Sequence, residues 1–119
     1  MSYDFDEYQQ FTRTTAIYPG AATGSAEARI YCTLGLSGEA GEVAEKVKKI
    51  IRVGGLSALA SIDDETKQAL AKEVGDALWY AARLSDELGL KLSDVARANA
   101  EKLSSRKDRG LLHGSGDNR

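Results

Sequence analysis

Apolar residues recur at intervals of three and four along most of the chain, which is the spacing of one face of an α-helix. The pattern predicts a short amphipathic helix ended by Pro19 and three longer helices, at about residues 25–53, 64–88 and 94–106. Abundant Ala, Leu, Glu and Lys with a single proline also favour helices. We therefore predict an all-α fold, a bundle of four main helices in which the second and third form an antiparallel pair.

Polar residues suited to capping stand near the expected helix starts. Ser25, Asp63 or Asp64, and Ser93 would cap the second, third and fourth helices, because a short polar side chain accepts from a free backbone N–H. Glycines at the ends of the second and third helices are suited to terminate them. The apolar connection at residues 56–62 is expected to form a packed turn.

The second helix contains three glycines within seven residues, Gly35, Gly38 and Gly41. Each is expected to weaken a helix by about 1 kcal/mol relative to alanine, so a compensating interaction is needed. Tight packing against another helix and close approach of a ligand both fit the sequence. A break of the helix near Gly35 is a third option.

Each of the two long helices has an apolar stripe that we expect to be core. The stripes comprise Leu36, Ala40, Val43, Val47, Ile50 and Ile51 in the second helix, and Leu70, Val74, Ala77, Ala81, Leu84 and Leu88 in the third. Glu45 points away from its stripe and is expected to be solvated.

Two acidic pairs border these stripes: Glu39 with Glu42, and Glu73 with Asp76. Residues three apart are neighbours on a helix surface, so each pair can hold one hard cation between its carboxylates. Packing of the two helices would bring the four carboxylates together as a metal site. Surface helices are commonly rich in glutamate, so the spacing alone is equally compatible with a solvated face.

The sequences around the acidic pairs, GLSGEAGEVAEKVKK and KEVGDALWYAARLSDELGL, resemble the MazG-like nucleoside triphosphate pyrophosphohydrolases of the all-α NTP pyrophosphatase superfamily. The family pattern is ExxE followed by ExxD, with the carboxylates binding Mg²⁺. The resemblance implies Glu39, Glu42, Glu73 and Asp76 as catalytic metal ligands, with Mn²⁺ as a substitute ion. Many members have a further acidic residue where this chain has Gly38, and the connection between the pairs is long here.

The fourth helix carries Asn99 and Arg106 on one stripe, with Lys102 on its margin. Such polar groups need partners, and capping of the helix end is one explanation. The resemblance of NAEKLSSR to the family implies instead that these residues contact the phosphates of the substrate, a role that suits arginine and lysine. Trp79 in the third helix fits packing at the core edge or stacking on a base, and we keep it as a secondary substrate-binding candidate.

At 119 residues, the chain is predicted to be a single domain, residues 1–106, followed by a glycine-rich tail, residues 107–119. The composition of the tail predicts flexibility, whereas the resemblance also allows it to fold over nucleotide or a neighbouring subunit. A net charge of −2 gives no electrostatic reason to expect a nucleic-acid polymer as partner. Cys32 has no disulfide partner and no apolar run has membrane length, so we expect a soluble, cytoplasmic protein.

The resemblance implies hydrolysis of a nucleoside triphosphate between its α and β phosphates, in a homodimer or homotetramer. The family occurs in cellular house-cleaning of nucleotide pools and in phages, which inclines the expected substrate toward deoxynucleotides. Two alternatives remain: a non-catalytic helical interaction module, and a related all-α hydrolase that prefers deoxyuridine nucleotides.

Overall fold

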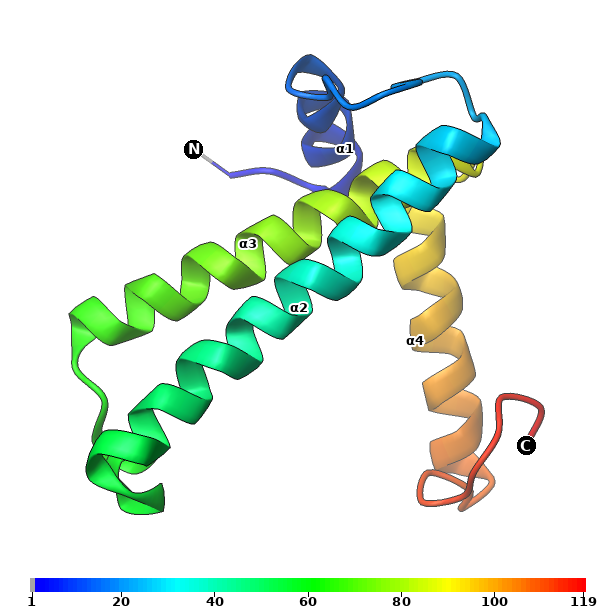
Figure 1. Cartoon of the computed structure of the whole chain (residues 1–119). Coiled ribbons are helices and arrows are strands. Elements are labelled where there is room, and N and C mark those ends of the chain that lie inside the picture. Colours follow the sequence, from blue (N-terminus) through cyan, green and yellow to red (C-terminus); the bar gives the residue numbers. More distant parts are fainter. Residues whose placement is uncertain (1) are drawn as a thin grey trace.

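The computed structural model describes residues 2–119, and every regular element within them is a helix (Figure 1). In chain order the elements are α1 (Phe5–Thr14), α2 (Ala26–Gly54), the 3₁₀ helix η1 (Leu56–Ser61), α3 (Asp64–Glu87) and α4 (Leu92–Asp108). The long helices α2 and α3 run antiparallel and side by side (Figure 1). The predicted all-α fold, with its central antiparallel pair, is confirmed.

Local capping chemistry accounts for the starts of both long helices. The Ser25 hydroxyl accepts from the Ala28 N–H at 3.2 Å, and Asp63 Oδ1 accepts from the Thr66 N–H at 2.7 Å. Both predicted caps are therefore confirmed, with Asp63 chosen over Asp64. The helix α1 ends at Thr14, ahead of Pro19, where the hydroxyls of Thr14 and of the C-cap Thr15 donate to the carbonyls of Phe11 and Thr12 and so compete with the backbone N–H groups.

The prediction that Ser93 caps the fourth helix is wrong. The helix α4 begins at Leu92, and the Ser93 hydroxyl in its first turn donates to Asp6 Oδ1 at 2.6 Å. The backbone N–H of Leu92, the first residue of α4, donates to Gln9 Oε1 at 3.0 Å. A side chain of α1 thus performs the capping, because α1 packs against the start of α4.

The best-buried part of the molecule lies at one end of the hairpin, where α1 packs on α3 and the segment 15–25 packs against both long helices (Figure 1). Tyr18, Ala28 and Cys32 form its centre. The Tyr18 ring stacks on Tyr31 with centroids 5.3 Å apart and meets Trp79 edge-on at 6.1 Å. Packing at this end holds the two long helices in a defined register.

The apolar stripes expected to be core are only partly buried. Val74 is 56% exposed and Leu88 45%, and Ala40 in α2 is also exposed. The reason is that α4 packs on α1 and α3 without contacting α2, and extends away from the hairpin (Figure 1). Among the described residues, 2–119, no element therefore covers one side of the hairpin.

The glycines of α2 differ in what surrounds them. A Cβ on Gly35 would overlap the ring of Tyr80 from α3, so close packing between the two helices explains that glycine. Gly38 and Gly41 face open space, and α2 is continuous through all three positions. The break considered near Gly35 is absent.

The tail folds back on the end of α4, although its composition predicts flexibility. The Leu111 N–H donates to the Arg106 carbonyl at 2.7 Å, and Arg119 Nε donates to the Leu111 carbonyl at 2.9 Å. Arginine side chains thus satisfy carbonyl groups of a segment that has no helix of its own. No helix within residues 2–119 combines the length and apolar character needed to cross a membrane.

Candidate metal centre

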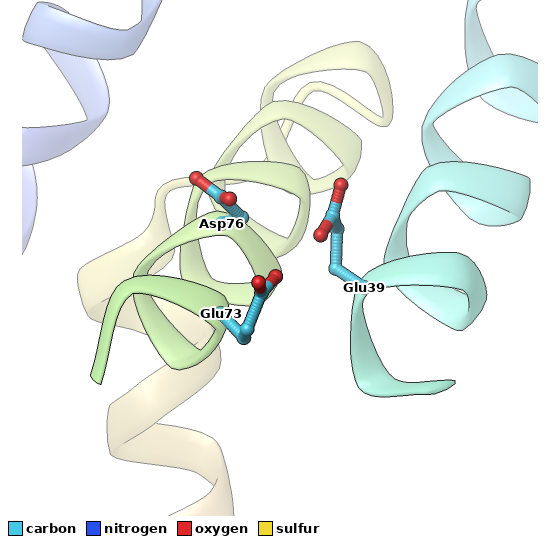
Figure 2. Close-up of side chains that lie close together, drawn as sticks. All are labelled: Glu39, Glu73 and Asp76. Carbon is cyan, nitrogen blue, oxygen red and sulfur yellow. The ribbon is translucent and has the colours of Figure 1, made fainter. Parts of the chain in front are cut away.

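Three carboxylates converge between α2 and α3 (Figure 2). Glu39 projects from α2 toward Glu73 and Asp76 of α3, and one carboxylate oxygen from each lies within 4.8 Å of the other two. The spacing of three residues places Glu73 and Asp76 on one face of α3, and antiparallel packing places Glu39 opposite them. The structure therefore brings together three of the four acidic residues that the sequence singles out.

Glu42, the fourth of these residues, is exposed and lies outside the cluster of three. It is still close enough for its negative charge to contribute to the raised pKa of Glu39. A rotation of its long side chain would be needed for it to join the other carboxylates.

The carboxylates of the cluster repel one another, and the ion pair with Lys46 offsets only part of their negative charge. Partial burial raises the pKa of Glu39, and the charges of Asp76, Glu73 and Glu42 raise it further. The side chain of Lys46 lies beside the cluster, with its Nζ 3.5 Å from Glu73 Oε1. Like charges held this close favour binding of a cation.

Lys46 did not emerge from the sequence reasoning. The available signal was its position two turns after Glu39, which puts both residues on the same side of α2.

The donor set fits Mg²⁺ by its chemistry and its spacing. Mg²⁺ prefers oxygen ligands in octahedral geometry at about 2.0–2.1 Å, so oxygens on one ion lie roughly 3–4 Å apart. Carboxylate oxygens within 4.8 Å of one another reach that spacing through small side-chain rotations. Asp76 is exposed, which leaves one side of the cluster accessible to water and phosphate oxygens.

Two tyrosines, which sequence reasoning did not single out, are influenced by the negative charge of the cluster. Burial raises the pKa of Tyr8 in α1, and the charge of Asp76 adds to the effect. Burial also raises the pKa of Tyr80, with contributions from Tyr31 and then Glu39. Tyr80 follows Asp76 by four residues, a helical interval that could have placed it beside the site.

The candidate phosphate-binding residues of α4 do not meet the carboxylates within one chain. Asn99 and Lys102 line a shallow depression on α4 together with Val95 and Ala98, and α4 makes no contact with α2. Arg106 is only 4% exposed because the tail covers it.

Trp79 packs at the edge of the core. Its Nε1 donates to Thr15 Oγ1 at 2.8 Å, and its ring lies edge-on to Tyr80 with centroids 5.0 Å apart. These contacts fit the first of the two roles considered for Trp79, packing at the core edge, and stacking on a base stays a prediction.

The chain matches known proteins at two levels. A family model described as "MazG nucleotide pyrophosphohydrolase domain" matches residues 30–111, a span that contains all four acidic residues. The chain is 50% identical over 115 residues to the "Gene 37 protein" of Mycobacterium phage L5, covering 96% of this chain and 97% of that protein. The name of this phage protein states no activity. No solved structure matches the chain.

Proposed function

Because the chain belongs to the MazG nucleotide pyrophosphohydrolase family, we propose that it is a Mg²⁺-dependent enzyme that converts nucleoside triphosphates to monophosphates and pyrophosphate. Deoxynucleotides are the proposed substrates. The observation that carries the proposal is the convergence of Glu39, Glu73 and Asp76 from two facing helices. Family membership supports the class of reaction, and the cluster offers the carboxylate ligands that we propose for its metal ion.

Glu39, Glu73 and Asp76 would hold Mg²⁺, with Glu42 turning inward as a fourth carboxylate and Mn²⁺ as a substitute ion. When bound, the ion neutralises charge on the phosphates and lowers the pKa of the attacking water. A carboxylate of α2, Glu39 or Glu42, accepts the proton of that water.

Water attacks directly in this proposal, without a covalent intermediate. The one cysteine, Cys32, is fully buried, and burial raises the pKa of its thiol. A buried thiol of raised pKa is a poor nucleophile. The acidic cluster is therefore the proposed centre of the reaction.

Asn99, Lys102 and Arg106 are the proposed phosphate-binding residues, with Trp79 as a secondary contact for the base. Since α4 extends away from the carboxylates of its own chain, we propose a homodimer or homotetramer in which α4 of one subunit serves the carboxylates of another. Apolar residues exposed on the long helices support an assembly of this kind, since contact with a second chain would bury them. They include Ile30, Leu34, Val74 and Leu78.

Pyrophosphate release from a panel of ribo- and deoxynucleotides tests the proposed reaction. We expect release that requires Mg²⁺, stops with EDTA and is fastest with a deoxynucleoside triphosphate. Folded protein that releases no pyrophosphate from any nucleotide at saturating Mg²⁺ would favour the non-catalytic module. Selective turnover of deoxyuridine nucleotides, diphosphates included, would favour the related hydrolase.

Mixing two inactive variants tests the shared site. Asp76→Asn lacks a proposed metal ligand and Arg106→Ala lacks a proposed phosphate contact, so each homo-oligomer should be inactive. Mixed oligomers contain some sites with neither change if the two residues act across a subunit boundary, and activity should return on mixing and subunit exchange. Activity that stays absent in verified mixed oligomers would place both residues in one chain's site.

A further inference from the structure

The C-terminal tail covers the two cations of α4 that are proposed to bind phosphate. Arg106 Nη2 donates to the carbonyls of Gly116 at 3.3 Å and Asp117 at 3.0 Å, and lies 3.4 Å from Asp117 Oδ1. Lys102 Nζ lies 3.6 Å from the same carboxylate oxygen. One tail carboxylate thus contacts both cations.

Burial by the tail leaves Arg106 only partly satisfied. Its side chain is 5% exposed, and within residues 2–119 its Nε is buried with no hydrogen-bond partner. A guanidinium can donate five hydrogen bonds, and phosphate oxygens are among its strongest acceptors. Arg106 can therefore donate at least one further hydrogen bond, from Nε, to an anion other than the tail.

A carboxylate oxygen between an arginine and a lysine has the same chemistry as a phosphate oxygen in that position. We propose that Asp117 is an internal competitor, which occupies Lys102 and Arg106 until the polyphosphate of the substrate displaces the tail. This inference rests on the proposed role of Lys102 and Arg106 in the reaction. Two anions at one pair of cations would repel each other, so binding of polyphosphate and contact with Asp117 exclude one another.

The tail is attached in a way that permits displacement. The Asp117 side chain is 87% exposed, and Arg119 holds the tail through hydrogen bonds that are also exposed. Gly110 and Gly116 have positive φ angles of 69° and 83°, a region that glycine enters without strain. Gly110 precedes the tail segment and Gly116 directly precedes Asp117, so both can act as hinges while α4 stays folded.

Asp117 is ionised at neutral pH, as a competitor must be. The charge of Lys102 lowers the pKa of Asp117, and the hydrogen bond from Arg106 lowers it further. The contact is therefore charged on both sides, and removal of the carboxylate charge should release the cations.

Calorimetric titration of the full chain with inorganic tripolyphosphate in EDTA tests the proposal without hydrolysis. Asp117→Asn should lower the dissociation constant about two- to tenfold, the range expected when two ion pairs that share one exposed carboxylate no longer compete. Asp94→Asn is the matched control, because it removes an exposed carboxylate that pairs with Arg97 at 2.8 Å on the same helix. The control should bind as the wild type does.

Two further variants extend the test. A chain that ends at Gly110 should bind tripolyphosphate at least as tightly as Asp117→Asn, since it lacks the whole competitor. Adding Arg106→Ala to Asp117→Asn should abolish the gain, because the released cation is then missing.

Unchanged or weaker binding in Asp117→Asn would overturn the inference, as would absence of tripolyphosphate binding in every variant. Pyrophosphate release is measured on the same preparations. If the wild type releases none while Asp117→Asn binds tripolyphosphate more tightly, the proposed reaction fails and the competition by Asp117 stands.

Discussion

Glu73 and Asp76 lie near the middle of α3, and Asp86 and Glu87 lie at its C-terminal end, so one helix presents two acidic pairs in different surroundings. The first pair faces a third carboxylate, Glu39, across the hairpin. The second pair faces arginines and hydrogen-bond donors. The same residue types therefore experience opposite electrostatics on one helix.

Glu87 is almost completely buried and well supplied with donors. The Tyr18 hydroxyl donates to its carboxylate at 2.7 Å, and the backbone N–H groups of Ala22 and Gly24 donate at 2.9 and 3.0 Å. Burial opposes ionisation of Glu87, but the hydrogen bonds from Tyr18, Gly24 and Ala22 and the charge of Arg83 outweigh it and lower the pKa. Glu87 thus fastens residues 18–24 to the end of α3.

Asp86 is equally well paired. Arg13 donates to both of its oxygens at 2.7 Å, and Arg83 Nη1 donates to Oδ2 at 2.7 Å. The hydrogen bond from Arg13 is the largest influence on the pKa of Asp86 and lowers it. Carboxylates that the protein itself satisfies have a structural role, whereas the unsatisfied cluster around Glu39 retains the capacity to bind a cation.

Replacement of Glu87 should produce the largest loss of stability. Glu87→Ala leaves three donors, the Tyr18 hydroxyl and the backbone N–H groups of Ala22 and Gly24, without their acceptor. It also removes one of the two carboxylates beside the fully buried Arg83, which keeps Asp86, and we expect a loss of about 3–5 kcal/mol. Urea denaturation at pH 7 measures the loss. A loss below about 1 kcal/mol would show that the network is not structural.

The pH dependence of the Glu87 effect follows from the sign of the shift. The folded-state pKa of Glu87 lies below the ordinary value of 4.5, so its contribution is present above pH 4.5 and is lost as pH falls through the folded-state pKa. The difference between wild type and Glu87→Ala should therefore shrink in acid.

Replacement of Asp76 should produce the largest loss of activity with little loss of stability. Asp76→Asn removes one negative charge from the proposed metal site, and we expect kcat/KM to fall at least about a hundredfold, which corresponds to about 2.7 kcal/mol. Glu42→Gln in the same assay shows whether the exposed fourth carboxylate is required. Near wild-type turnover of both variants at saturating Mg²⁺ would remove the carboxylates from the reaction.

Neutralising Glu39 should stabilise the metal-free protein at pH 7. The folded-state pKa of Glu39 is raised above 4.5, so the folded protein favours the protonated form of this side chain. The stability that protonated Glu39 contributes is fully present below pH 4.5 and is lost as pH rises through the folded-state pKa. Glu39→Gln should therefore have a higher Tm than the wild type in EDTA at pH 7, and the gap should close below pH 4.5. Mg²⁺ should raise the Tm of the wild type more than that of the variant. A wild type that is the more stable protein in EDTA would contradict like-charge repulsion in the cluster.

The smallest effect is expected at Glu45. Its carboxylate lies 2.9 Å from Lys48 and 3.9 Å from Lys49 on the exposed side of α2, so Glu45→Gln should change stability by no more than about 0.5 kcal/mol. Its turnover should equal that of the wild type. Inactivation comparable to that of Asp76→Asn would mean that the carboxylates of α2 are assigned to the wrong positions.

Local sequence determines the elements that carry these groups. Ser25 and Asp63 start α2 and α3 through hydrogen bonds that span three residues, so their roles follow from the chain alone. The interval between Glu73 and Asp76 likewise ensures that both project from one face of α3. Capping and helical periodicity act within one or two turns, which is why they predict correctly here.

Tertiary packing decides which of these faces meet and what each side chain finds there. Because of this packing, Glu39 lies in the carboxylate cluster and Glu42 is exposed. The packing of α1 on α4 also places Gln9 where it caps α4, the role expected of Ser93. Tertiary packing also covers Arg106 with a tail whose composition predicts flexibility. Helical spacing gives a direction around one helix axis, whereas these outcomes depend on where helices cross and on partners up to 87 residues away in the chain. For that reason the sequence predicts that Glu73 and Asp76 share one face of α3. Only the folded molecule decides that Asp86 and Glu87 are paired with arginines and hydrogen-bond donors, whereas Glu73 and Asp76 face another carboxylate.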